Sequence, residues 1–128
     1  MKDIHFIGRL NREIFKAVTE DIATDEVIIT EVQIEHIKER HPGDYEKYFQ
    51  YIQAIIEEPD YILEANKPDS AVLLKNIMAN GKNYKLILRF KTSRDSKEYK
   101  NSVITFLSID EKDWKRLLKN KKILYKRE

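Results

Sequence analysis

Two apolar segments decide the fold of this chain: Ala71-Val-Leu-Leu-Lys-Asn-Ile-Met78 and Tyr84-Lys-Leu-Ile-Leu-Arg-Phe-Lys91. Both are rich in aliphatic and β-branched residues, which favours strands. Between them lies Asn80-Gly81, a pair that tolerates the positive φ angles of tight hairpin turns. The sequence therefore predicts an antiparallel hairpin in the second half of the chain.

Further strands are predicted on both sides of this hairpin. The segments Tyr61–Leu63 and Ser102–Ser108 are apolar and bounded by turn-rich breaks, which extends the hairpin into an antiparallel meander. Near the N-terminus, Ile4–Ile7 and Val27–Ile29 also have strand character. The apolar residues of segment 11–22 follow neither the two-residue period of a strand nor the 3.6-residue period of a helix.

Three helices are predicted from capping signals and apolar spacing. Thr30 and Gln33 form a capping box, and Pro42 ends the helix near Arg40. A second helix should run over residues 44–58, with core-facing side chains at helical spacing: Tyr45, Tyr48, Phe49, Ile52, Ile55 and Ile56. A third should run from its cap at Asp110 to Lys119, followed by a short strand at residues 123–125.

These elements predict an α+β fold in which N-terminal helices pack on a four-stranded, or slightly larger, antiparallel sheet, with a short C-terminal helix. The 128 residues suit a single domain over residues 1–128. The chain has no cysteine and no apolar run long enough to cross a membrane, so we expect a cytoplasmic protein without disulfides, thiolate metal sites or a membrane partner.

The formal charge of +2 is small, but the basic residues are unevenly distributed. They crowd the C-terminal end at Lys112, Lys115, Arg116, Lys119, Lys121, Lys122, Lys126 and Arg127. This end could follow a phosphate backbone, which would make RNA a partner. A basic terminal helix is equally well understood as a solubilising face.

The helix over residues 30–40 carries the most reactive side chains, because His36, Arg40 and His41 fall within six consecutive positions. His36 and Arg40 are four residues apart and share one helix face, while Ile34 and Ile37 point at the core. Imidazoles exchange protons near neutral pH and a guanidinium binds phosphate with a planar fork. The trio therefore indicates a metal-free ribonuclease.

Structural roles would also account for the trio. His41 could cap the last carbonyls of the helix, and His36 and Arg40 could belong to a solvated face in which Glu35 and Glu39 form ordinary ion pairs. A metal site is disfavoured, because the chain lacks cysteine and any His-Glu-x-x-His pattern. Its three glycines form no phosphate-binding loop, so we expect no cofactor.

The order of elements and several local sequences together resemble one known family. The segments are the His-x-x-x-Arg-His helix, Pro59-Asp60, the sheet, Asn101-Ser102-Val103-Ile104-Thr105, and Lys121-Lys122-Ile123-Leu124-Tyr125. This set is similar to the phage-type nuclease domains of the barnase/EndoU/colicin/RelE superfamily. The resemblance covers residues 7–125 and implies helices that precede a four-stranded antiparallel sheet, with RNA cleaved without a metal on the sheet and the facing helix.

The resemblance also implies which residues form the site. His36, Arg40 and His41 match the helix motif, and Thr105 and Tyr125 match polar positions of the last strands. Substrate-binding candidates are Lys75, Arg89 and Lys122. Thr105 is also ordinary in a β-branched strand, and Tyr125 would serve as an aromatic at the edge of the core.

The expected reaction is attack of an RNA 2′-hydroxyl on the adjacent phosphorus, with one histidine as base and another as acid. The resemblance suggests a phage or mobile-element toxin or effector, with an inhibitor or antitoxin protein as a further partner. The alternative is a non-catalytic protein- or RNA-binding module of a phage or mobile-element assembly.

Overall fold

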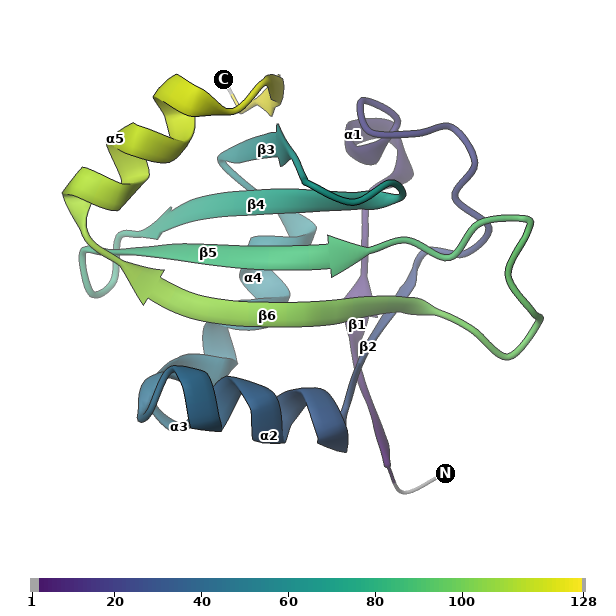
Figure 1. The fold of residues 1–128 in the computed structure, drawn as a ribbon, viewed down its shortest axis with the longest axis horizontal. Helices are drawn as coiled ribbons and strands as arrows, with labels where there is room; N and C mark the ends of the chain where they lie inside the picture. Colours follow the sequence, from purple (N-terminus) through teal and green to yellow (C-terminus); the bar gives the residue numbers. More distant parts are fainter. Residues whose placement is uncertain (1–2, 128) are drawn as a thin grey trace.

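A hairpin of β4 (Ser70–Ile77) and β5 (Lys82–Arg89) forms the centre of the sheet in the computed structural model, which describes residues 3–127 (Figure 1). The two strands pair without interruption from Ser70 opposite Arg89 to Ile77 opposite Lys82. Gly81 lies in the turn with a φ of 69°. The predicted hairpin is confirmed, and Gly81 supplies the positive φ that it needs.

The strands β3 (Tyr61–Glu64) and β6 (Asn101–Ile109) flank this hairpin and complete the predicted antiparallel meander. The sheet within residues 3–127 is larger, however, and has the order β1-β2-β6-β5-β4-β3-β7. At one edge β7 (Ile123–Lys126) pairs antiparallel with β3. At the other, β2 (Glu26–Thr30) pairs in parallel with β6, and β1 (Ile4–Arg9) pairs antiparallel with β2.

The predicted α+β class is correct, but the predicted four-stranded, or slightly larger, antiparallel sheet is a seven-stranded mixed sheet within residues 3–127. The predicted N-terminal helices do not match either, because the N-terminal part of the described chain also supplies the strands β1 and β2. The parallel pair joins Val27 to Asn101 and Ile28 to Ser102. These partners are far apart in sequence, so neither strand's hydrophobic pattern specifies the other as its neighbour. The order of the outer strands is a property of the tertiary structure.

Helices cover the two faces of the sheet unequally. The main core lies between the sheet and the side that carries α1 (Arg12–Phe15) and α4 (Ile52–Glu57). A smaller cluster lies under α5 (Glu111–Asn120) on the other face. Figure 1 shows α4 behind the sheet, whereas α5 and α2 (Glu31–Arg40) lie at opposite margins of the front face. No helix within the described residues is long and apolar enough to cross a bilayer.

The segment predicted as one helix over residues 44–58 is broken. It consists of α3 (Asp44–Tyr48), a 3₁₀ turn at Phe49–Tyr51 and α4. A 3₁₀ turn aligns side chains three residues apart, and the rings of Tyr48 and Tyr51 both contact the ring of Tyr84, with centroids 5.3 and 5.7 Å away. The predicted core position of Phe49 is wrong, because this side chain is exposed, whereas Ile52, Ile55 and Ile56 are buried as predicted.

The helix α2 follows β2 without a loop, and both of its ends are fixed. At its start the Thr30 hydroxyl accepts a hydrogen bond of 3.2 Å from the Gln33 N–H, as the capping signal predicted. Beyond its end, the Asp44 carboxylate accepts hydrogen bonds from the N–H and the hydroxyl of Ser108, at 2.9 and 3.2 Å. Since Ser108 belongs to β6, these contacts hold α2 alongside that strand.

The Asn101 side chain, at the start of β6, links β2 to the antiparallel meander by hydrogen bonds. It is completely buried, and its amide group donates hydrogen bonds to the carbonyls of Thr24 and Glu26, at 2.7 and 2.9 Å. Its own carbonyl oxygen accepts a hydrogen bond of 2.8 Å from the Lys91 N–H. One side chain thus satisfies three backbone groups that belong to two distant segments.

We expect Asn101→Ala to lower the free energy of unfolding by roughly 3 kcal/mol, because each buried backbone group that loses its partner costs on the order of 1 kcal/mol or more. Denaturant unfolding measures this loss. Asn120→Ala at the exposed end of α5 is the matched control and should change stability by a few tenths of that amount. Equal effects of the two variants would contradict the anchoring role.

Candidate active site

A pocket of about 390 Å³ lies between α2 and the front face of the sheet, and we call it the histidine pocket. Its lining residues are Gln33, His36, Arg40, His41, Lys85, Ile87, Ile104, Thr105 and Leu107. The structure thus brings the predicted trio together with Thr105, across more than sixty residues of sequence. None of the described residues that line this pocket is acidic.

The helical period explains how α2 presents its trio. Ile34 and Ile37 are buried in the core, so His36 and Arg40 lie on the other side of the helix, where solvent reaches them. The helix ends at Arg40, and His41 caps it, since the His41 backbone N–H donates to the Ile37 carbonyl at 2.9 Å. The His41 side chain is half-buried and lines the pocket.

No ion pair with a carboxylate of residues 3–127 holds His36, Arg40 or His41. The surface ion pairs that would make Arg40 part of an ordinary solvated face are therefore not formed within the described chain. His5 differs, since its Nε2 lies 2.5 Å from a Glu31 carboxylate oxygen and outside the pocket. An unpaired guanidinium beside two imidazoles is suited to binding an anion.

A β-bulge in β6 places Thr105 at the pocket. Thr105 pairs with Ile87, but the next pair joins Leu88 to Val103, so Ile104 is the extra residue. In a regular strand Ile104 and Thr105 would point to opposite faces of the sheet, but here both line the histidine pocket. The bulge leaves Val103 in the core and turns two successive side chains, Ile104 and Thr105, toward the pocket.

The site also contains a cation that sequence reasoning missed. Lys85 lies on β5, half-buried at the pocket floor beside Ile87. Burial lowers the pKa of the Lys85 amine, the positive charges of Lys121 and Arg116 lower it further, and Asp113 opposes this shift. Its signal in the sequence is a lysine on the same strand face as Ile87, inside an otherwise apolar strand.

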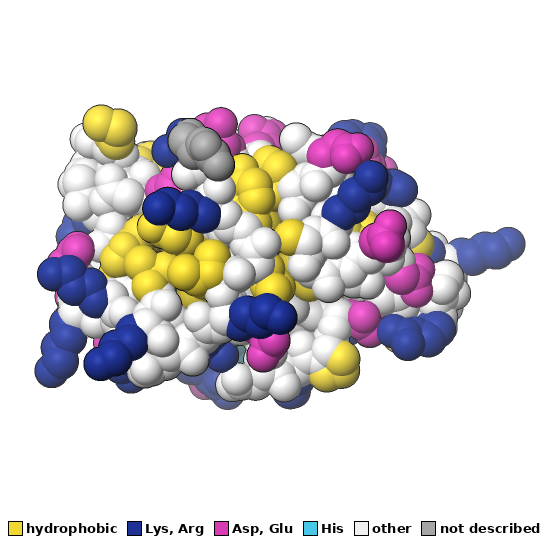
Figure 2. All heavy atoms as spheres, turned by 90° about the horizontal axis from the view of Figure 1, so that it is seen from above, with side chains coloured by type: hydrophobic (Ala, Val, Ile, Leu, Met, Phe, Trp, Pro, Cys, Tyr) yellow, Lys and Arg dark blue, Asp and Glu magenta, His cyan; other side chains and the backbone are white. Residues whose placement is uncertain are grey.

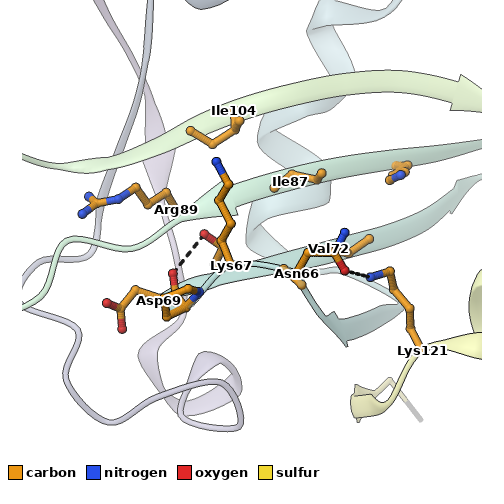
Figure 3. Close-up of a pocket in the computed structure, with 12 residues that line it drawn as sticks. Asn66, Lys67, Asp69, Val72, Ile87, Arg89, Ile104 and Lys121 are labelled. Carbon is orange, nitrogen blue, oxygen red and sulfur yellow. Dashed lines mark hydrogen bonds between the residues drawn. The ribbon is translucent and has the colours of Figure 1, made fainter.

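A second pocket of about 560 Å³ adjoins the first, and we call it the lysine pocket. It is lined by residues 65–70 together with Val72, Lys85, Ile87, Arg89, Ile104 and Lys121. Figure 3 shows Lys67 and Arg89 around the sheet strands that form its floor, with Lys121 reaching Asn66 from the α5 side. Lys85, Ile87 and Ile104 line both pockets, so the two adjoin on one face of the sheet, and we call them together the groove.

Several predicted residues lie outside the histidine pocket. Lys75 is on the opposite face of the sheet, where its ammonium donates to the Glu58 carbonyl at 2.5 Å and lies 3.7 Å from the Asp60 carboxylate. Its predicted role in substrate binding is therefore corrected to a structural one. Arg89 lies in the lysine pocket and forms an ion pair with Asp95 at 3.0 Å.

The two predicted residues of the closing segment do not reach the pocket either. Tyr125 packs on the main core, on the face of the sheet away from the groove. It belongs to β7, four strand spacings from the β6 residue Thr105 in the strand order, which is about 19 Å at roughly 4.8 Å per spacing. Lys122 is exposed and lines neither pocket. The composite site with Thr105 and Tyr125 is therefore wrong for Tyr125.

The predicted basic end is less continuous than the sequence suggested. Arg116 pairs with Asp113 at 2.8 Å, and Arg127 pairs with Asp60 at the same distance. Figure 2, which views the molecule from the side of α5 and β7, shows Lys and Arg side chains interspersed with acidic and apolar ones. Of this run of residues, Lys121 is the one that lines a pocket.

Comparison with known proteins shows the family of this chain. A family model described as phage-Barnase-EndoU-ColicinE5/D-RelE like nuclease 2 matches residues 4–126. The chain belongs to this nuclease family. The resemblance inferred from the sequence is thereby confirmed over almost the whole chain. No curated protein and no solved structure matches the chain at a significant level.

The partly buried position of Lys85 predicts that its positive charge lowers the stability of this phage-type nuclease. Lys85→Met should raise the melting temperature at neutral pH by a few degrees, because it replaces a partly desolvated cation by an apolar chain of similar length. Thermal unfolding of both proteins measures the difference, with Lys97→Met in an exposed loop as the control.

The advantage of Lys85→Met should shrink as the pH rises. Since burial lowers the pKa of Lys85 in the folded state, the folded protein loses this proton before the unfolded chain does. Wild-type stability therefore gains relative to the variant between the lowered pKa and the ordinary lysine value of about 10.4. An advantage that is independent of pH would contradict desolvation of the ammonium.

Proposed function

We propose that this member of the nuclease family is a metal-independent endoribonuclease whose reaction takes place in the histidine pocket. The observation that carries the proposal is the meeting of His36, His41, Arg40 and Lys85 in one pocket without an acidic residue. Two groups that exchange protons near neutral pH are thereby combined with two cations that favour a phosphate.

The reaction that fits these residues is transfer of the phosphoryl group to the neighbouring ribose hydroxyl. One histidine accepts the proton of the 2′-hydroxyl as its oxygen forms a bond to phosphorus. The bond from phosphorus to the 5′ oxygen breaks, and the other histidine donates a proton to that oxygen. The products are a 2′,3′-cyclic phosphate and a free 5′-hydroxyl, and no water or metal is consumed.

The cations of the pocket would act on the charge that develops in this step. The guanidinium of Arg40 offers two parallel N–H groups to the non-bridging oxygens, and the Lys85 ammonium adds a point charge from the floor. The Thr105 hydroxyl would orient the phosphate from β6. Arrangement of the donors before substrate binds makes this stabilisation effective, because they need no reorganisation during the reaction.

A carboxylate-bound metal fits this site less well. Residues 3–127 contain no group of three or more His, Cys, Asp or Glu side chains arranged to hold a metal ion. Glu35, Glu39 and Asp44 are near the trio in sequence but do not line the pocket, and the Asp44 carboxylate accepts a hydrogen bond from the Ser108 N–H. We therefore expect RNA cleavage to persist in a chelator.

We expect His36→Ala and His41→Ala each to reduce RNA cleavage by roughly 10²- to 10⁴-fold if they perform acid and base catalysis. The double variant should be little worse than the worse single one, because residues that act in one step are not additive. The assay follows cyclic-phosphate ends on a short RNA in the presence of EDTA. His5→Ala is the matched control, and it should retain activity because His5 lies outside the pocket.

Full activity in both pocket variants, or loss of wild-type activity in EDTA, would refute this mechanism. If RNA is bound but never cleaved by the wild-type chain, the alternative of a non-catalytic RNA-binding module takes its place. Thermal unfolding of each variant separates a catalytic defect from a folding defect. Because His36 and His41 lie at the pocket rather than in the main core, both variants should fold.

Arg40→Lys tests the guanidinium separately. The substitution keeps the positive charge but removes the two parallel donors, so kcat/KM should fall by roughly tenfold or more. The same substitution at Arg12, which is exposed on α1 and lines neither pocket, should leave kcat/KM unchanged. An Arg40→Lys variant as active as the wild type would show that charge alone suffices.

A further inference from the structure

We propose that the lysine pocket binds the nucleotide next to the scissile phosphate of a single-stranded RNA. This inference rests on the proposed function, because it takes the histidine pocket as the place of cleavage. It assigns to the larger pocket a ligand class and a position along the substrate. Three features of the lysine pocket support it: lysines without an ion pair in the described part of the chain, an apolar floor, and adjacency to the histidine pocket.

The lysine pocket has an excess of positive charge. Lys67, Lys85 and Lys121 form no ion pair with any carboxylate of residues 3–127. The acidic residue of the lining, Asp69, is neutralised by Arg94 at 2.7 Å. The charge of Lys121 opposes protonation of Lys85, so an anion placed between the two amines would relieve their repulsion.

The floor of the pocket is apolar. Val72, Ile87 and Ile104 project from three neighbouring strands, β4, β5 and β6. Figure 3 shows Lys67 extending over the middle of this floor, with Arg89 and Lys121 at opposite ends. A flat apolar floor under a cationic rim suits a nucleotide, whose base packs on the floor while its phosphate faces the amines.

The walls of the pocket are held in place by hydrogen bonds. The Phe90 N–H donates to the Asp69 carbonyl at 2.8 Å, and the Lys121 ammonium donates to the Asn66 amide oxygen at 2.9 Å. The volume of about 560 Å³ falls within the range of roughly 300–1,000 Å³ that is typical of small-ligand pockets. The pocket is therefore large enough for a nucleotide without rearrangement.

The adjacency of the two pockets gives the position of this nucleotide along the RNA. Lys85, Ile87 and Ile104 line both pockets, so the two lie side by side on the same face of the sheet. An RNA strand whose scissile phosphate lies between His36 and Arg40 must pass over Lys85 to run from the histidine pocket into the lysine pocket. The next nucleotide along that path lies on the floor of the lysine pocket. Paired bases could not reach this floor, because they remain stacked inside a duplex.

The test measures binding rather than cleavage. Fluorescence anisotropy with 2′-O-methylated single-stranded oligonucleotides of two to six residues gives affinities without turnover, because a methylated 2′ oxygen cannot attack phosphorus. The test variant is Lys67→Ala/Lys121→Ala. The matched control is Lys112→Ala/Lys119→Ala, which removes the same charge from exposed positions of α5 that line neither pocket.

We expect the test variant to bind the longer oligonucleotides roughly tenfold or more weakly at low salt, and its salt slope to be less steep by about 0.7, since each phosphate contact of a single strand contributes about 0.7 and the pocket holds one phosphate. The control should bind like the wild type. Removal of one base next to the cleavage position should weaken wild-type binding. The same abasic oligonucleotide should lose less affinity in the test variant, because both changes weaken the binding of the same nucleotide in the lysine pocket.

Equal losses in the test and control variants would overturn the proposal, because they would show a general effect of charge. An unchanged affinity of the test variant would also overturn it. Cleavage assays on unmodified RNA keep the two proposals apart. Normal cleavage with no contribution from Lys67 and Lys121 would refute the nucleotide site alone, whereas specific binding through these lysines without cleavage would refute the ribonuclease activity alone.

Discussion

The hydrogen bonds of the buried Asn101 side chain are the interaction on which the rest of this structure depends. They join β6 to the backbone before and within β2, at an edge where the parallel pairing is only two residue pairs long. A pairing this short provides few ladder hydrogen bonds of its own. Because α2 follows β2 directly, the place where β2 is fastened determines where His36 and Arg40 lie.

The histidine pocket depends on two local departures from regular structure. The bulge at Ile104 turns Thr105 toward the groove while Val103 stays in the core. The second departure is Lys85, a cation on an otherwise apolar stretch of the central strand. Both features cost stability, through lost ladder hydrogen bonds and through desolvation of charge. Strained or poorly solvated positions are common at functional sites, where they arrange donors before the substrate arrives.

The groove illustrates why overall charge says little about this protein's binding surface. The chain carries a formal charge of only +2, and the ion pairs of α5 and β7 neutralise part of the basic C-terminal end. The unpaired cations are instead collected from α2, β5, the 65–70 loop and the segment between α5 and β7. Field strength at a site depends on which charges lie close together and lack partners, and this is decided by folding.

Membership of the nuclease family and the arrangement of the pocket are two independent observations, and both support a nuclease function for this chain. The family match spans residues 4–126 and concerns the chain as a whole. The pocket concerns particular atoms, and it offers two imidazoles, a guanidinium and an ammonium to one volume of about 390 Å³. Because one fold can carry many chemistries, the site adds support that family membership alone does not give.

The sequence by itself determined the local elements of this protein. The hairpin about Gly81, the capped helix from Thr30 and the exposed face with His36 and Arg40 follow from turn chemistry, capping and helical period, which act over a few residues. The tertiary structure alone decided which strand lies beside β2, that Ile104 forms a bulge, that Lys85 joins the site and that Tyr125 does not. These outcomes depend on pairing and burial between residues far apart in the chain, and no short-range pattern encodes them.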